Sequence, residues 1–316
     1  MVAKIFIDGE AGTTGLQIRE RLAGRRDLEV LSISADKRKD QDERKRLLNA
    51  ADVAILCLPD DAARESVSLI ENDSTRVIDA STAFRVDPDW AYGFAEMDKA
   101  QGDAIAAARF VANPGCWPQG LIGTVRPLIA AGLLPADLAV TYNGISGYTG
   151  GGKQMIAEYE AEGDAASHFM PYALTFNHKH VPEMTRYTGL AAAPLFVPSV
   201  GDFAQGMTTF VPLQLGRLDT VPSGKQLHAA IADHYAAIKD SFVVIAPYPE
   251  VAKTPDLDPQ AHNDTNTMTL HVFANDARAQ AVLVAVYDNL GKGASGAAVQ
   301  NLNLMLGVSA RESLAA

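Results

Sequence analysis

Cysteine is scarce in this sequence, and the scarcity excludes one way of stabilising a fold. Only Cys57 and Cys116 occur among 316 residues. A framework of disulfides therefore cannot hold the chain together. Each of the two cysteines has to be interpreted either as a buried thiol or as a reactive one.

Long apolar runs and an excess of positive charge are also missing. No stretch approaches the roughly 20 consecutive apolar residues that span a bilayer, so we expect no membrane-embedded segment. The formal net charge of -11 disfavours nucleic acid as a partner, because binding to phosphates needs a basic surface. The first residues lack the pattern of a secretory signal, so a cytoplasmic location is the default expectation.

Strand and helix patterns alternate over the first part of the chain. Short apolar runs at 3–8, 28–34 and 52–60 predict strands, and polar segments with helical patterns follow them. The run at 52–60 is continuously apolar, which is typical of a strand buried on both faces of a parallel sheet. The alternation predicts an α/β fold with a Rossmann-type, doubly wound parallel sheet.

The pattern changes after Cys116. Glycine-rich stretches such as GISGYTGGGK (144–153) suggest loops, and longer alternating runs at 207–215 and 267–275 suggest antiparallel strands. The sequence therefore predicts a second domain of mixed, largely antiparallel α+β structure. Length alone also makes two domains likelier than one.

Gly9, Gly12 and Gly15 form a G-x-x-G-x-x-G turn between the first predicted strand and the first predicted helix. Glycines at such a turn let the backbone approach a pyrophosphate, and free N–H groups at the helix start attract anions. The turn predicts a dinucleotide site. A packing turn is the alternative interpretation, because the first spacing departs from G-x-G-x-x-G.

The type of dinucleotide depends on a charged stretch about 20 residues further on, where the ribose is recognised in such folds. Lys37 and Arg38 favour the 2′-phosphate of NADP, whereas Asp36 favours a free ribose hydroxyl. A solvated charged turn is the other interpretation. The candidate cofactor contacts in this part of the chain are Gly9, Gly12, Thr13, Thr14, Gly15, Ser34, Lys37 and Arg38.

The two cysteines stand in different surroundings. Cys57 lies within the apolar run AILCLP, where a thiol is a small hydrophobic side chain with a raised pKa. Cys116 follows the turn Asn113-Pro114-Gly115 and precedes a stretch with helical apolar spacing. A cysteine at a helix N-terminus is stabilised as the nucleophilic thiolate. A structural cysteine remains the alternative at this point.

A thiolate nucleophile needs a proton shuttle, and His178 and His180 are the candidates. They are two residues apart in FNHKHVPEM, so they would share a face in an extended stretch. A surface turn is the alternative interpretation. Metal binding with Glu183 is a weaker one, because no further histidine or cysteine follows at zinc-site spacing, and we predict no metal.

Five motifs in order carry a resemblance to a known family. They are STAFR (81–85), NPGCWPQG (113–120), GISGYTGGGK (144–153), HKHVPEM (178–184) and KGASGAAVQNLN (292–303). Together they resemble the N-acetyl-gamma-glutamyl-phosphate reductases, in the shorter, type 2 branch of that family. The resemblance covers nearly the whole chain, and the family's fold resembles that of glyceraldehyde-3-phosphate dehydrogenase.

The resemblance implies roles for individual residues. Cys116 would be the nucleophile, and His178 or His180 the acid/base, the other binding substrate. Lys153 stands where the longer branch has arginine, which would replace a bidentate phosphate clamp by a point charge. The implied substrate contacts are Arg85, Lys153 and Asn113, and the further cofactor contacts are Ser81 and Asn289.

The resemblance also implies an activity and an organisation. The activity is NADPH-dependent reduction of N-acetylglutamyl phosphate to the semialdehyde in arginine biosynthesis, through a cysteine thioester and with release of inorganic phosphate. The implied domains are an NADP-binding domain at 1–115, completed by 290–316, and a catalytic and oligomerisation domain at 116–289 of a dimer or tetramer. Alternatives are a reductase for an aspartyl or aminoadipyl phosphate, a cysteine acyltransferase or hydrolase, and a regulator without catalysis.

Overall fold

A computed structural model describes residues 2–249 and 257–316 of the chain. These residues divide into two compact units, which are described here one at a time. The first unit comprises the residues up to 95, residues 100–115 and residues 294–315. The second comprises residues 96–99 and 116–293 with the terminal residue 316. The predicted domain 116–289 includes residues 250–256, which lie outside the described residues.

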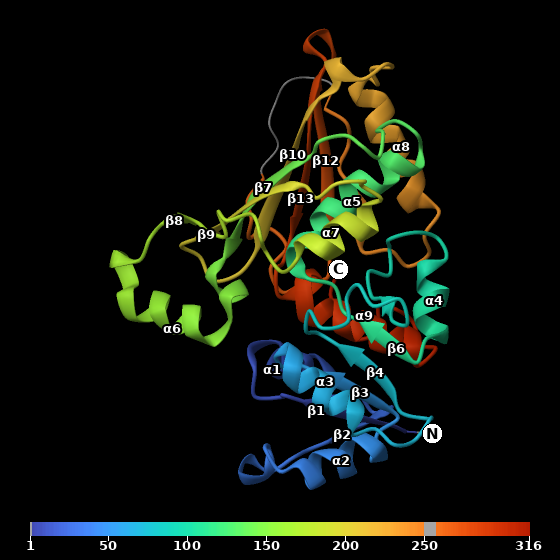
Figure 1. Cartoon of the computed structure of the whole chain (residues 1–316), viewed down its shortest axis with the longest axis vertical. Helices are drawn as coiled ribbons and strands as arrows, with labels where there is room; N and C mark the ends of the chain where they lie inside the picture. The colour runs from blue at the N-terminus through green and yellow to red at the C-terminus, as the bar shows by residue number, and fades with distance from the viewer. Residues whose placement is uncertain (1, 250–256) are drawn as a thin grey trace. The chain divides into compact units, whose positions relative to one another are not determined.

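The first unit is built on a six-stranded parallel sheet with the strand order β2-β1-β3-β4-β6-β5 (Figure 1). Its strands are β1 (Ala3–Asp8), β2 (Leu28–Leu31), β3 (Val53–Leu56), β4 (Arg76–Asp79), β5 (Ala91–Tyr92) and β6 (Phe110–Ala112). Apolar side chains point from β1 to both faces, Ile5 and Ile7 to one and Phe6 to the other. Such two-sided burial explains the continuous apolar runs in the sequence.

Helices cover both faces of this sheet. They are α1 (Thr13–Leu22), α2 (Gln41–Ala50), α3 (Asp60–Ser68), α4 (Gln101–Ala107) and α9 (Gly296–Met305). Residues of α1, α4 and α9 share one apolar cluster with the sheet, and residues of α2 and α3 share the other. The predicted Rossmann-type, doubly wound sheet is therefore confirmed.

Two of the predicted strands are shorter than the apolar runs that predicted them. The second ends at Leu31 rather than 34, and the third ends at Leu56 rather than 60. Pro59 is the N-cap residue of α3, so the end of the third run already leads into a helix. The end of the second run leads into a 3₁₀ turn at Ala35–Lys37.

The second unit contains a seven-stranded sheet with the order β11-β12-β13-β10-β7-β9-β8. Its strands are β7 (Thr141–Gly147), β8 (Phe169–Pro171), β9 (Leu195–Gly201), β10 (Met207–Gln214), β11 (Val243–Ile245), β12 (Met268–Asn275) and β13 (Gln280–Tyr287). Four neighbouring pairs are antiparallel, and β7–β9 and β11–β12 are parallel. The prediction of a mixed, largely antiparallel sheet is confirmed.

The helices of the second unit are α5 (Cys116–Ala130), α6 (Gly152–Glu162), α7 (Val181–Thr188) and α8 (Gly224–Ala236). A π-helical turn at Gly291–Ser295 begins in the second unit and ends in the first. Helix α5 contacts β10, β13, α7 and α8, and α8 also contacts β12, so these helices pack against the central strands (Figure 1). Within residues 2–249 and 257–316, no helix has both the length and the apolar character that crossing a membrane requires.

The glycine-rich segment 144–153 was predicted as a loop, and this is wrong for its first four residues, which belong to β7, and for its last two, which begin α6. Residues 144–147 complete β7 and pair with β9, and residues 144–146 also pair with β10. A Cβ atom at Gly144 would lie 2.5 Å from the Thr208 carbonyl oxygen and 3.0 Å from the Trp117 ring. The glycine therefore serves a close approach between strand and helix rather than a turn.

Candidate active site

Cys116 is the first residue of α5, as the sequence predicts. The carbonyl of Cys116 accepts a hydrogen bond of 2.7 Å from the hydroxyl of Tyr287, a residue of β13. At the start of a helix the first N–H groups have no partner within the helix, and the macrodipole is positive. The cysteine thus stands at the end of α5 that favours a negative charge.

A row of aromatic rings connects the first turn of α5 with the two candidate histidines. Trp117 packs edge-on against Phe196 with ring centroids 5.3 Å apart, and Phe196 packs against His178 at 5.3 Å. The Trp117 indole N–H donates to the Tyr172 hydroxyl at 3.0 Å. Burial, and then negative charge at Cys116, raise the pKa of the Tyr172 phenol. The second unit therefore brings the predicted nucleophile and both histidines into one neighbourhood.

The histidines lie in a turn and not in an extended stretch. His180 has a helical backbone conformation and immediately precedes α7, which has a proline in its first turn. The His180 backbone N–H donates to His178 Nδ1 at 3.2 Å, and the two rings are 4.7 Å apart. Since Nδ1 of His178 accepts, its neutral ring carries the proton on Nε2. His178 is half-buried, whereas His180 is only 7% exposed.

Lys153 and Asn289, two further predicted residues, also belong to the second unit. Lys153 is exposed in the first turn of α6. Asn289 is buried, with its Oδ1 accepting from the Gly206 N–H at 2.7 Å and its Nδ2 donating to Thr149 Oγ1 at 3.1 Å. The Asn289 amide thus joins two loops of this unit. In the part of the chain that the structure describes, no three His, Cys, Asp or Glu side chains form a group that could hold a metal ion.

The glycine turn of the first unit follows the end of β1. Gly9 has a φ of +91°, and a Cβ atom there would clash with the carbonyl oxygen of Cys57. The Gly12 N–H donates to the Gly9 carbonyl at 2.9 Å, and Gly12 is the N-cap residue of α1, in which Thr13 and Thr14 come first. At Gly9 and Gly12 the turn therefore has no side chain that would keep an anion from the N-terminus of α1.

A pocket of about 520 Å³ opens beside this turn. Gly9, Gly12 and Arg38 of the predicted cofactor residues line it. The complete lining is Asp8, Gly9, Glu10, Ala11, Gly12, Ile33, Arg38, Lys39, Arg44, Cys57, Leu58, Ala62 and Glu65. The combination of a glycine turn, an apolar wall and cationic side chains suits a dinucleotide. Desolvation raises the pKa of the Cys57 thiol in this wall to about 12, as its apolar run predicts.

Sequence reasoning missed Arg44 in the pocket lining. It lies in the polar helix α2, yet it is buried, with its guanidinium Nη2 3.1 Å from Asp8 Oδ2 and 2.6 Å from Ser66 Oγ. Its Nη1 also pairs with Glu65 at 3.2 Å. Helical periodicity gives no sign that an arginine in so polar a stretch is buried. Lys39 was recognisable as part of the basic run 37–39.

The predicted ribose-recognition residues surround the 3₁₀ turn after β2. Ser34, Asp36, Lys37 and Arg38 are all exposed. The Ser34 hydroxyl hydrogen-bonds Asp36 and lowers the pKa of its carboxyl. One guanidinium nitrogen of Arg38 lies 3.6 Å from the Glu10 carboxylate. Arg38 is thus the one of these four residues that also lines the pocket.

Ser81, Arg85 and Asn113 are buried in the first unit. The Ser81 hydroxyl donates to Asp79 Oδ2 at 2.6 Å, and burial raises the pKa of Asp79 to about 6. Arg85 Nε donates to the Asn113 carbonyl at 3.0 Å. The Asn113 amide donates to the Ala294 carbonyl and accepts from the Asn301 amide, both at 3.0 Å. Asn113 therefore connects the end of β6 with the segment that leads into α9.

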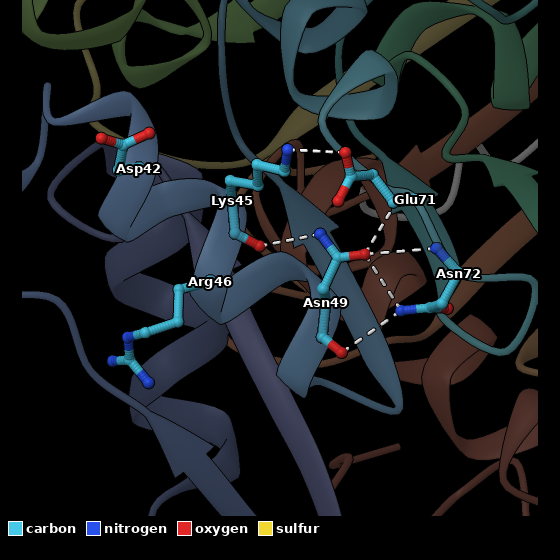
Figure 2. Close-up of a pocket in the computed structure, with 6 residues that line it drawn as sticks. All are labelled: Asp42, Lys45, Arg46, Asn49, Glu71 and Asn72. Carbon is cyan, nitrogen blue, oxygen red and sulfur yellow. Dashed lines mark hydrogen bonds and ion pairs between the residues drawn. The ribbon is translucent and has the colours of Figure 1, made fainter.

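A second pocket of the first unit lies between α2 and the turn before β4 (Figure 2). Asn49 occupies its centre, where the side-chain oxygen accepts from the backbone N–H groups of Glu71 and Asn72. The Lys45 ammonium pairs with the Glu71 carboxylate at 2.6 Å. These polar groups bind one another and join α2 to the turn before β4. The pocket is therefore not part of the candidate site.

Comparison with known families matches both parts of the chain. The family model described as "Semialdehyde dehydrogenase, NAD binding domain" matches residues 4–105. The model described as "Semialdehyde dehydrogenase, dimerisation domain" matches residues 116–289.

Curated relatives and solved structures agree with these matches. An N-acetyl-gamma-glutamyl-phosphate reductase of Chelativorans sp. is 67% identical over 97% of this chain and 99% of its own length. A reductase of the same name from Mesorhizobium japonicum is 65% identical over 98% of this chain and 100% of its own. Aspartate semialdehyde dehydrogenase II from Vibrio cholerae shares the fold, with a TM-score of 0.70, 15% identity and coverage of 97% of this chain and 99% of its own.

A further solved structure with this fold contains the cofactor that the sequence suggests. Aspartate semialdehyde dehydrogenase from Candida albicans, solved with NADP, has a TM-score of 0.67 at 12% identity and covers 97% of this chain and 99% of its own. At such identities the likeness concerns the fold alone. Because the curated relatives are far more similar and match nearly end to end, the chain belongs to the N-acetyl-gamma-glutamyl-phosphate reductases of the semialdehyde dehydrogenase family.

Proposed function

We propose that this chain reduces N-acetylglutamyl phosphate to N-acetylglutamate semialdehyde, with NADPH as reductant and release of inorganic phosphate, in arginine biosynthesis. The observation that carries the proposal is Cys116 at the first position of α5, in a chain 67% identical to a reductase of that name. Residues 1–115 with 290–316 would form the domain that binds the cofactor. Residues 116–289 would carry catalysis and subunit contacts.

The pocket beside the glycine turn supports the choice of cofactor. Gly9 and Gly12 leave room for a pyrophosphate at the start of α1, and Arg38 and Lys39 offer positive charge where a 2′-phosphate would lie. Glu10 in the same wall partly offsets this charge. When bound, the nicotinamide would supply the hydride that reduces the acyl group. We propose a preference for NADPH over NADH that rests on Arg38 and Lys39.

Cys116 would perform the first chemical step. Its thiolate attacks the carbonyl carbon of the acyl phosphate, the bond to the phosphate oxygen breaks, and a thioester remains on the sulfur. The acyl phosphate is already activated, so the protein has to supply only a nucleophile and cationic groups for the phosphate. Lys153 and Arg85 are our candidates for anion binding. Of the two, Lys153 is exposed and Arg85 already bonds to backbone carbonyls.

His178 is our candidate for the acid/base. It would protonate the oxygen of the thiohemiacetal as it forms and take the proton back when the carbon–sulfur bond breaks. The half-buried position of His178 and the proton on Nε2 favour it over the more deeply buried His180.

Replacing the two histidines one at a time tests that assignment. We expect His178→Asn to lower kcat by about 10²–10³-fold and to flatten the pH dependence of kcat, because a general acid/base contributes roughly this much. We expect His180→Asn to raise KM for the acyl phosphate more than it lowers kcat. Steady-state kinetics over a range of pH separates the two effects, and an unchanged pH profile in His178→Asn would move the role to His180.

The reverse reaction provides the direct test of the proposed function. We expect phosphate-dependent reduction of NADP by N-acetylglutamate semialdehyde, with NAD at least about tenfold less effective in kcat/KM, a difference of 1.4 kcal/mol in the barrier. Aspartate semialdehyde and the aminoadipate analogue serve as competing substrates in the same assay. A preference for either of them would replace the substrate in our proposal and leave the chemistry, whereas turnover without phosphate would contradict the chemistry itself.

We also propose that the chain forms a homo-oligomer through the face of the second sheet that α5 and α8 leave uncovered. The paired residues Phe210, Val284 and His271 form one row across β10, β13 and β12. The next row toward the end of β10 is apolar and consists of Pro212, Val282 and Phe273. Directly opposite residues of neighbouring strands share a face. This supports a second copy as the partner, since the matching family model describes a dimerisation domain.

A further inference from the structure

Three hydroxyl groups from neighbouring strands meet beneath the first turn of α5. They belong to Tyr142 on β7, Thr209 on β10 and Tyr287 on β13, and β10 lies between the other two strands. Both tyrosines are fully buried. A Cβ atom at Gly120 would lie 2.6–2.9 Å from the three hydroxyl oxygens. Only glycine at position 120 therefore lets the hydroxyls reach the helix backbone.

The Tyr287 hydroxyl bonds to two backbone groups of this turn. It donates to the Cys116 carbonyl at 2.7 Å and accepts from the Gly120 N–H at 3.2 Å. In an α-helix these are the two groups that pair directly, the N–H of one residue with the carbonyl four residues earlier. The side chain thus takes part in the hydrogen-bond ladder at the residue that begins the helix. Tyr142 donates to the next carbonyl, that of Trp117, at 2.6 Å.

Because both phenols stay protonated, their hydroxyl groups remain hydrogen-bond donors. Burial raises the pKa of both Tyr142 and Tyr287 above the ordinary value, so both hydroxyls keep their protons and donate. Each phenol has one proton, which Tyr142 donates to the Trp117 carbonyl and Tyr287 to the Cys116 carbonyl, so the Thr209 hydroxyl is the group that can donate to Tyr142. The donors of both tyrosine–backbone hydrogen bonds are therefore fixed.

We propose that Tyr287 is a positioning residue for Cys116, whose hydroxyl fixes the first turn of α5 and strengthens the N–H group that this turn offers to the thiolate. The inference deepens the proposed function and rests on it, because it takes Cys116 as the nucleophile. Tyr287 itself would touch neither substrate nor cofactor.

The physical reason lies in the peptide group between Cys116 and Trp117. A hydrogen bond donated to its carbonyl polarises the whole group, so the N–H of Trp117 becomes a stronger donor. That N–H is one of the first in α5, where N–H groups have no partner within the helix and stabilise a negative charge. The bond from Tyr142 cannot act in this way, because the Trp117 carbonyl belongs to a peptide group whose nitrogen is that of Pro118, which has no N–H.

Two other titratable groups of this neighbourhood, Tyr172 and His178, belong to the segment before α7. Negative charge at Cys116 contributes to the raised pKa of Tyr172, and the Tyr172 hydroxyl accepts a hydrogen bond from the Trp117 indole. His178 packs against Tyr172 with ring centroids 5.8 Å apart. These groups lie on a different element from the tyrosines of the sheet. A change confined to the Tyr287 hydroxyl therefore leaves them in place.

The pH dependence of Cys116 alkylation in the full chain tests the proposal. Iodoacetamide is the probe, and the modified peptide is identified by mass. We expect Tyr287→Phe to move the midpoint of the alkylation profile upward by about half to one pH unit, the shift that one net hydrogen bond can produce. We expect kcat to fall about tenfold, with KM for the acyl phosphate changed by less than about twofold.

Tyr235 of α8 offers a matched control, because its hydroxyl also bonds to the backbone of α5. Its hydroxyl donates to the Gly123 carbonyl of α5 at 2.8 Å, about two turns from Cys116. Tyr235→Phe therefore removes a buried hydrogen bond of the same kind, and we expect a fall in thermal midpoint similar to that of Tyr287→Phe. We expect its alkylation profile to match that of the unmodified chain, because the bond lies outside the first turn.

Three outcomes would overturn the proposal. One is a Tyr287→Phe profile and kcat equal to those of the unmodified chain, and a second is an equal shift in Tyr235→Phe. The third is a shift in Tyr142→Phe as large as that in Tyr287→Phe, since we expect Tyr142→Phe to give less than half of it. Alkylation needs no turnover, so its result stays separate from the phosphate-dependent assay, where a failure would count against the proposed function.

Discussion

Cys116→Ser is expected to lower kcat by about 10⁴-fold or more, which is the usual effect of removing a covalent nucleophile. A serine hydroxyl at the start of α5 keeps its proton near neutral pH, whereas attack on the acyl phosphate needs an anion. Binding of NADPH, followed by its fluorescence, should change little, because the pocket beside the glycine turn lies in the other unit. The phosphate-dependent assay and the binding titration together separate lost chemistry from lost folding.

The second cysteine provides an internal control for this prediction. With its pKa raised to about 12, Cys57 has almost no thiolate near neutral pH. Iodoacetamide should therefore inactivate the enzyme by modifying Cys116, with Cys57 unmodified in the same sample. N-acetylglutamyl phosphate added without cofactor should leave an acyl group on the Cys116 peptide. Inactivation that follows modification of Cys57, or substantial activity of Cys116→Ser, would contradict the assignment.

Local pattern was enough for the parts of the fold that depend on neighbouring residues. The apolar runs of the first unit predicted strands because both faces of a parallel sheet are buried, and β1 begins and ends where its run does. The turn before Cys116 and the apolar spacing after it predicted a helix that begins at the cysteine. In both cases the residues that carry the sequence pattern belong to the predicted strand or helix or directly adjoin it.

Residues whose role depends on distant partners could not be predicted in this way. Tyr287 reaches Cys116 from a strand 171 positions later, and it does so only because Gly120 has no side chain. No local pattern specifies which strands are neighbours in a mixed sheet. The same holds for Arg44, which periodicity places on a polar helix and which Asp8 of β1 makes a buried residue. The glycines at 144–147 were misjudged because strand and loop glycines look alike until the neighbouring strand is known.

Lys292→Met is expected to lower the free energy of unfolding of the second unit by about 3–5 kcal/mol, because it leaves a buried carboxylate without its counter-charge. Lys292 Nζ lies 2.6 Å from Glu96 Oε2, and both side chains are 1% exposed. Burial lowers the pKa of Lys292, and the Glu96 carboxylate opposes that shift. Urea unfolding followed by the fluorescence of Trp117, in a Trp90→Phe background, reports on the second unit alone.

The double variant Glu96→Gln, Lys292→Met distinguishes a lost charge pair from lost packing. The amide keeps an acceptor for the Phe242 N–H, which Glu96 Oε1 binds at 3.1 Å, and it carries no charge to bury. We therefore expect the double variant to recover more than half of the stability that Lys292→Met loses. Lys45→Met, which removes an exposed pair with Glu71, should cost less than about 1 kcal/mol. Equal losses in the single and the double variant would mean that the methylene chain of Lys292, and not its charge, stabilises this part of the second unit.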